Sequence, residues 1–172
     1  MDEQITRLLD LLDEAGVEFA VIGGLAVNAW LEPRFTADVD VTVHAPPATM
    51  DRLKVVLASH GYRVTREHGA AQPSGPDFVR FVSDAAGITL EVQASKTAFQ
   101  REVLRRAGAA GTPRIATPED LIVLKLIANR PKDRIDLLGL MQLDGLDWGY
   151  VERWAAAWDV VDRLRALRRD GP

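Results

Sequence analysis

The hydrophobic pattern divides the chain into a mixed α/β part followed by helices. Leucines recur on one side of residues 3–15, which is typical of an amphipathic helix, and Gly16 ends it. The apolar run 17–22 predicts a buried strand, and residues 37–43 alternate between polar and valine positions, as in a strand with one polar face. The remaining pattern predicts strands at 62–65, 78–83 and 87–93, an extended piece at 112–115, and helices at 25–31, 47–59, 97–107, 118–128, 132–143, 147–157 and 160–169.

This order of elements predicts an α/β (α+β) fold, in which helices flank a mixed twisted sheet and a C-terminal helical bundle follows. Residues 1–115 form the expected α/β core, and residues 116–172 form a helical region packed on it as one compact unit. The helical region has a clear beginning, because Thr117 suits a helix N-cap and Pro118 suits the first helical position.

Composition and charge narrow the class of protein. Of the 172 residues, 47% are hydrophobic and 27% charged, and the absence of cysteine excludes disulfides, thiol nucleophiles and cysteine-based zinc sites. No apolar run approaches the roughly 20 residues of a membrane span, and residues 1–4 lack the pattern of a secretory signal. We therefore expect a cytoplasmic protein without a membrane partner.

The net charge of −4 gives no overall sign of nucleic-acid binding. Local basic clusters do occur, and solvated helix faces are their ordinary explanation. The clusters are Arg101, Arg105 and Arg106; Arg130, Lys132 and Arg134; and Arg163, Arg165, Arg168 and Arg169.

A strand that ends in Gly23-Gly24 and opens a helix is the first candidate binding feature. Such a junction exposes backbone N–H groups, and glycines let a phosphate approach the backbone closely. The alternative is an ordinary tight turn.

Asp38 and Asp40 are the second feature, because residues two apart on a strand point to the same face. Two such carboxylates repel each other unless a cation lies between them. Mg²⁺ prefers carboxylate and phosphate oxygens, and two ions about 3.5–4 Å apart stabilise the attacking and leaving oxygens of phosphoryl transfer. The alternative is the solvent face of an edge strand, but the two features in this order favour a phosphoryl-transfer site.

A third carboxylate would complete this site. Glu91 shares the polar face of its predicted strand with Thr89, and a neighbouring strand would place it beside the two aspartates. An exposed glutamate on a half-buried strand is the alternative. Asp84 is a weaker candidate because it lies in the turn before Gly87.

Gly23-Gly24, Asp38-x-Asp40 and the later Glu91 resemble the motifs of the DNA polymerase beta-like nucleotidyltransferase superfamily. The resemblance implies transfer of a nucleoside monophosphate from an NTP, with Mg²⁺ held by the three carboxylates and the triphosphate bound at the glycines. Two positions depart from the pattern. Gly24 stands where many active members have serine, and Glu91 stands in place of aspartate, so both put the metal geometry in question.

Arg34-x-Thr36 before the aspartates, and Lys125 and Asp136 further on, resemble the nucleotidyltransferase toxins of type IV abortive-infection toxin–antitoxin systems. That resemblance implies that Arg34 and Lys125 neutralise phosphate charge and that Thr36 and Asp136 belong to the nucleotide site. It also implies RNA or tRNA as acceptor and a cognate antitoxin as partner. From the residues alone, Lys125 either reaches water or points at an anion, and Asp136 with Asp133 can equally form structural ion pairs.

Two other functions fit the same motifs. One is a small-molecule nucleotidyltransferase of the aminoglycoside or lincosamide type, which would favour an acidic cleft. The other is a non-catalytic nucleotide-binding protein with a degenerate site. An RNA acceptor instead requires the cluster at Arg101–Arg106 or the cluster at Arg130–Arg134 to border the cleft. The stripe of Tyr150, Trp154 and Trp158 indicates core or subunit packing more than base stacking.

Overall fold

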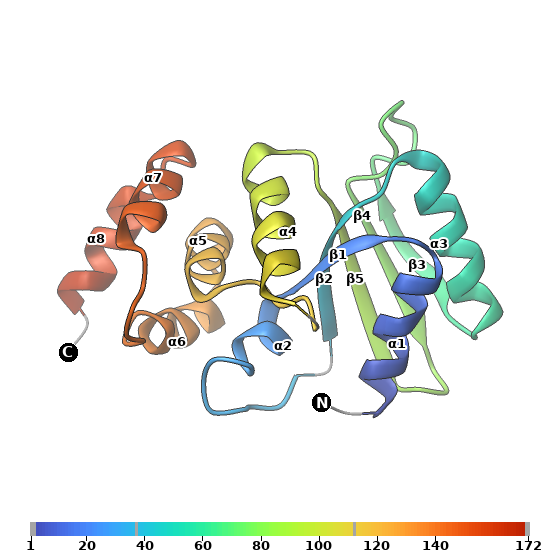
Figure 1. Cartoon of the computed structure of the whole chain (residues 1–172), viewed down its shortest axis with the longest axis horizontal. Coiled ribbons are helices and arrows are strands. Elements are labelled where there is room, and N and C mark those ends of the chain that lie inside the picture. The colour runs from blue at the N-terminus through green and yellow to red at the C-terminus, as the bar shows by residue number, and fades with distance from the viewer. Residues whose placement is uncertain (1–2, 37, 112, 171–172) are drawn as a thin grey trace.

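The computed structural model describes residues 3–36, 38–111 and 113–170 (Figure 1). Helices and strands alternate in the first part of this region, and helices alone make up the second. In chain order the elements are α1 (Glu3–Glu14), β1 (Glu18–Ile22), α2 (Gly23–Val27), β2 (Asp38–His44), α3 (Pro47–Ser59), β3 (Arg63–His68), β4 (Phe78–Ser83), β5 (Ile88–Ala94), α4 (Ala98–Ala110), α5 (Pro118–Ala128), α6 (Pro131–Leu140), α7 (Trp148–Ala157) and α8 (Val161–Asp170).

The five strands form one mixed sheet in the order β1-β2-β5-β4-β3. β2 and β5 are parallel, whereas the pairs β1–β2, β4–β5 and β3–β4 are antiparallel. In the view of Figure 1 the sheet stands between α4 and the helices α1 and α3. The predicted mixed sheet with flanking helices is therefore confirmed.

Strict alternation along β2 and β5 gives the sheet two different faces. Val39 and Val41 of β2 and Leu90 and Val92 of β5 are buried in the hydrophobic core, to which α1 and α3 contribute leucines. The side chains between them are polar and only partly buried. We call this second side of the sheet the polar face, and the acidic residues singled out in the sequence lie on it.

Helix α4 connects the sheet to the C-terminal helices. The ring of Phe99 packs against Trp154 at 5.0 Å and against Trp158 at 6.5 Å between centroids. At the other end of α4, Arg106 forms an ion pair with Glu119 of α5 at 2.8 Å. The predicted aromatic stripe of α7 thus packs within the molecule.

Several predicted elements have different bounds in the structure, and α2 and β3 differ for reasons that the contacts show. Helix α2 covers Gly23–Val27 instead of 25–31, because the chain turns away where the Trp30 indole donates a hydrogen bond to the carbonyl of Ala116 at 3.0 Å. Strand β3 continues to His68, since its antiparallel pairing with β4 extends beyond the predicted end at residue 65.

The predicted piece 112–115 forms a single bridge between Ile115 and Val21. Residues 37 and 112, which belong to two of the predicted strands or extended pieces, lie outside the described residues. Within the part of the chain that is described, no helix is long and apolar enough to cross a membrane.

Candidate active site

Strands β2 and β5 bring two of the predicted carboxylates together. The parallel register sets Asp40 directly opposite Glu91. Both line a cleft of about 110 Å³, with Gly23 beside them and with Lys125 and Arg130 on the opposite wall. The arrangement is an acidic pair on the polar face of the sheet, covered by cations from the start of the helical region.

Gly23 is required by the close approach of Asp40. Its backbone has φ of +68°, a conformation that L side chains rarely adopt, and a Cβ at this position would overlap the Asp40 carboxylate. At Gly24 a Cβ would lie 3.1 Å from the Thr36 hydroxyl, so the Thr36 side chain fills the space beside this glycine. Phosphate binding at the two glycines stays a prediction.

Asp40 lies in an unfavourable electrostatic environment. Burial and the negative charges of Glu91 and Asp38 raise the pKa of Asp40 from 3.8 to about 6, and the charge of Arg130 only partly offsets them. An ionised Asp40 therefore has a cost that a bound cation would relieve.

Glu91 has a cationic partner that the sequence analysis missed. Arg80, opposite Glu91 on β4, donates from Nε to Glu91 Oε1 at 2.9 Å, and a second guanidinium nitrogen contacts the same oxygen. This hydrogen bond to Glu91 raises the pKa of Arg80. The available signal was the alternation of 78–83, which puts Arg80 on the polar face without indicating which strand is its neighbour.

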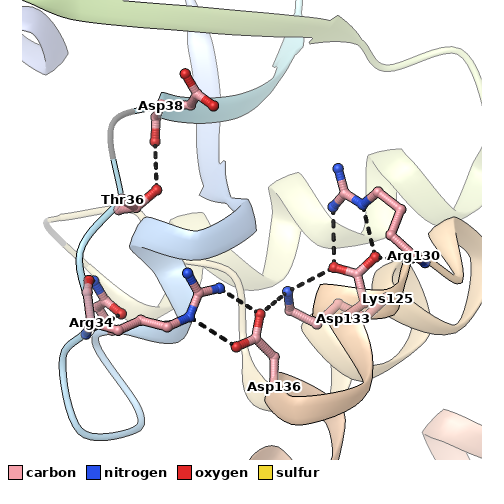
Figure 2. Close-up of polar contacts among 8 residues, drawn as sticks. Arg34, Thr36, Asp38, Lys125, Arg130, Asp133 and Asp136 are labelled. Atoms are coloured by element: carbon pink, nitrogen blue, oxygen red, sulfur yellow. Dashed lines mark hydrogen bonds and ion pairs between the residues drawn. The ribbon is translucent and has the colours of Figure 1, made fainter.

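The donor set fits magnesium. Among the described residues no three Asp, Glu, His or Cys side chains form a group that could hold a metal ion, so Asp40 and Glu91, opposite each other in the register, are the candidate ligands. Asp38 shares their face one step along β2, and its backbone carbonyl accepts a hydrogen bond from Thr36 at 3.3 Å (Figure 2). Magnesium commonly takes one or two carboxylates and completes its shell with phosphate oxygens and water.

Lys125 is buried between two aspartates of α6. Its ammonium lies 2.6 Å from Asp136 Oδ2 and 3.3 Å from Asp133 Oδ1 (Figure 2). Burial alone would raise the pKa of Asp136, but hydrogen bonds from Arg34 and Lys125 outweigh it and lower that pKa below its ordinary value. The side chain of Lys125 therefore does not extend into water but forms structural ion pairs with the protein's own carboxylates, and its contact with a triphosphate stays a prediction.

Two arginines extend this contact on either side. Arg34 donates to Asp136 through two nitrogens at 3.1 and 2.7 Å, and Arg130 donates to Asp133 at 2.8 and 3.2 Å. We call Arg34, Asp136, Lys125, Asp133 and Arg130 the charge ladder. It joins the segment between α2 and β2 to helices α5 and α6, and its three cations and two carboxylates have a net charge of +1. Of these groups, Lys125 and Arg130 line the cleft.

The predicted basic cluster on α4 does not form one outward surface. Arg106 turns toward Glu119 and Asp120 of α5, and Arg105 pairs with Glu102 of its own helix. In the second predicted cluster, Arg130 lines the cleft, as a contact with an anionic substrate would require.

A mixed sheet with an acidic pair on one face, closed by cations of a helical region, defines the class of nucleotidyltransferases. Within this class the chain belongs to the family described as "Nucleotidyl transferase AbiEii toxin, Type IV TA system", whose profile matches residues 7–168. The predicted family and the enzyme class are thereby confirmed.

Solved structures support the same fold at low sequence identity. The solution structure of the antibiotic-resistance factor ANT(2'')-Ia has a TM-score of 0.62 and 19% identity, with 97% of this chain and 94% of that chain covered. The crystal structure of ANT(2")-Ia with adenylyl-2"-tobramycin has a TM-score of 0.52 and 18% identity over 96% and 95%. An antigenic nucleotidyltransferase-like protein from Paracoccidioides brasiliensis has a TM-score of 0.50 and 16% identity over 95% and 90%. No curated protein matches the chain.

Proposed function

We propose that this nucleotidyltransferase is magnesium-dependent and transfers a nucleoside monophosphate from an NTP to a hydroxyl of an RNA, as the toxin of a toxin–antitoxin pair in the cytoplasm. The observation that carries the proposal is the position of Asp40 opposite Glu91, in a cleft whose other wall presents Lys125 and Arg130. This combination supports a site for cations next to a site for phosphate oxygens.

The acidic pair would hold the metal, with Asp38 beside it on the same strand face. Bound Mg²⁺, with two ions expected, supplies charge stabilisation for the attacking and leaving oxygens. In the reaction the acceptor oxygen forms a bond to the α-phosphorus while the bond to pyrophosphate breaks. Asp40 and Glu91 are the carboxylates that line the cleft, and one of them would take the proton of the acceptor hydroxyl.

The charge ladder would position the triphosphate. Asp133 and Asp136 fix Lys125 and Arg130 at the wall of the cleft, so their charges need little reorganisation when negative charge develops on the leaving pyrophosphate. Arg34 is 44% exposed, which leaves its guanidinium accessible to a phosphate oxygen.

Thr36 can compensate for the glycine that stands at position 24 in place of a serine. Many members of the superfamily have a serine there, whereas the Thr36 hydroxyl lies against Gly24 in this chain. We expect this hydroxyl to take the contact that the serine hydroxyl makes in those members.

The test is a transfer assay with the purified chain, each α-labelled NTP in turn, total cellular RNA and Mg²⁺. We expect label to enter RNA with the wild-type chain and with Asp51→Asn, an exposed position on α3, but not with Asp40→Asn. Equal labelling by Asp40→Asn would remove the proposed site. Label on an added aminoglycoside and none on RNA would assign a small-molecule acceptor instead.

The toxin role has its own test. Induced expression of the wild-type chain should arrest growth, and expression of Asp40→Asn should not. Co-expression of a cognate antitoxin should restore growth. Growth arrest by both forms of the chain would separate toxicity from nucleotidyl transfer and contradict this part of the proposal.

A further inference from the structure

The polar face of the sheet continues past the acidic pair and becomes basic. Arg80 on β4 lies opposite Glu91, and Arg66 on β3 lies opposite Arg80. Arg63 lies opposite Val82 on the same face. We call Arg63, Arg66 and Arg80 the basic strip. It adjoins the candidate site and is distinct from the basic clusters of the sequence analysis.

Within the basic strip Arg80 pairs with Glu91, whereas Arg66 and Arg63 have no close carboxylate contact among the described residues. Arg66 donates from Nε to His68 Nε2 at 2.7 Å, and Arg63 makes only long contacts, 3.3 to 3.4 Å, with the exposed Asp84. Like charges directly opposite each other across an antiparallel pair are destabilising, so the pair Arg66–Arg80 is unfavourable for the isolated sheet. An anion over this face would relieve that repulsion.

Two rings accompany the basic strip. The half-buried ring of Phe78 and the exposed ring of His68 lie opposite each other with their centroids 6.0 Å apart. Arginines interleaved with rings on an open sheet are the combination that binds single-stranded nucleic acid, because the cations contact phosphates while the rings stack on bases.

Charges on an edge strand also prevent sheet-to-sheet pairing, which is the plain explanation for Arg63 and Arg66. Arg80 lies on the inner strand β4, where that explanation does not apply, and its partner there is Glu91. The position of Arg66 opposite Arg80 is explained by neither contact. A β-bulge between Val64 and Arg66 produces this register.

We propose that the basic strip, with Phe78 and His68, is the surface that binds a single-stranded RNA acceptor. Its phosphates would contact Arg63 and Arg66, and a base would stack on Phe78. Two strand spacings separate Glu91 from Arg66, roughly 10 Å, which corresponds to about three stacked nucleotides at about 3.4 Å each. An RNA segment bound along the basic strip can present a hydroxyl group to the acidic pair. The name "acceptor" rests on the proposed function, whereas the binding itself does not.

The test measures binding of a fluorescently labelled single-stranded oligoribonucleotide by anisotropy over a range of salt concentrations, without NTP or Mg²⁺. For the double variant Arg63→Gln/Arg66→Gln we expect at least tenfold weaker binding at low salt. The slope of log K against log salt should become smaller by about 1.4, since each phosphate contact to a single strand contributes about 0.7. The matched control is Arg165→Gln/Arg169→Gln on the exposed side of α8, which makes the same change in charge and should leave the slope unchanged.

A second variant separates stacking from charge. Phe78→Leu keeps an apolar side chain at this position but removes the ring. We expect roughly tenfold weaker RNA binding with an unchanged salt slope, because stacking contributes to affinity without releasing counterions. Circular dichroism confirms that each variant is folded.

Equal slopes for the two double variants would overturn the inference, as would RNA binding that neither Arg63→Gln/Arg66→Gln nor Phe78→Leu weakens. Binding of tobramycin, a cationic acceptor, in place of RNA would also overturn it. A chain that shows the expected slopes but transfers no nucleotide to any acceptor contradicts the proposed function alone and leaves the binding surface intact.

Discussion

At the scale of single residues, Asp40 shows a conflict between stability and the proposed chemistry. Its pKa of about 6 in the folded chain lies above the ordinary value of 3.8, so folding favours the protonated form. The corresponding stabilisation is fully present below about pH 4 and is lost as the pH rises through 6. At neutral pH the folded chain therefore carries an ionised carboxylate at a cost.

Asp40→Asn removes this cost and should make the chain more stable while abolishing transfer. We expect the free energy of unfolding at pH 7 to rise by about 1–3 kcal/mol in metal-free buffer, and the gain to disappear near pH 4. Urea denaturation at both pH values measures it, with Asp51→Asn as control. A loss of stability at pH 7 would show that Asp40 is a structural residue.

Gly23→Ala should be more damaging than a glycine substitution in open space. Gly87 also has a positive φ, 63° against 68°, but nothing lies within 4 Å of a Cβ placed there. Gly87→Ala should therefore cost only the backbone strain, about 1–2 kcal/mol. Gly23→Ala should cost more and lower nucleotidyl transfer, because its methyl group displaces the Asp40 carboxylate. Thermal denaturation and the transfer assay compare the two variants, and equal effects would contradict the proposed role of Gly23.

The sequence predicts the position of a residue when the pattern of its own strand or motif is enough to determine it. Alternation along 87–93 put Glu91 on the same face as Thr89, and the structure brings it next to Asp40. Arg80 was missed because its importance depends on which strand lies beside β5, and a sequence pattern carries no information on strand order.

At the scale of elements, the charge ladder attaches the segment after α2 to α5 and α6. Lys125, Asp133 and Asp136 are all buried, and removal of Asp136 leaves the buried Lys125 with only the longer contact to Asp133. Arg34 and Arg130 at the two ends are partly exposed, so their ion pairs contribute less.

Asp136→Asn should therefore destabilise the chain strongly. We expect a loss of about 3–5 kcal/mol, mainly from the buried Lys125, measured by urea denaturation at pH 7. The control is Asp162→Asn, whose exposed pair with Arg165 should change stability by less than about 1 kcal/mol. Because the folded pKa of Asp136 is lowered, its contribution is present above pH 3.8 and is lost as the pH falls further. A loss no larger than that of Asp162→Asn would contradict the role of the ladder.

Element boundaries were predictable where local signals decide them. Thr117 caps α5 through a hydrogen bond from the Asp120 amide, and Pro118 occupies its first turn, as the sequence indicates. The end of α2 instead depends on the Trp30 contact with Ala116, which is distant in sequence. The length of β3 likewise depends on its pairing with β4.

At the scale of the whole molecule, α4 and the aromatic side chains of α7 hold the sheet and the helical region together. The boundary near residue 115 is still a prediction from sequence. The contacts that cross it include the Phe99–Trp154 ring pair and the Arg106–Glu119 ion pair. These contacts favour one cooperative unit over two independent domains, because separating the two parts would break them. The cleft is lined by residues of both parts.

Thermal unfolding should therefore be a single transition, with tryptophan fluorescence and far-UV circular dichroism coincident. Three of the four tryptophans, Trp148, Trp154 and Trp158, lie in the helical region, so fluorescence is weighted towards that region, whereas circular dichroism reports on the whole chain. Phe99→Ala should lower the free energy of unfolding by about 3–5 kcal/mol and shift both signals together. Phe35→Ala, at a side chain that is 90% exposed, should shift neither by more than about 0.5 kcal/mol. Two separated transitions would show instead that residues 116–172 unfold as a domain of their own, since the probes would then follow different structural units.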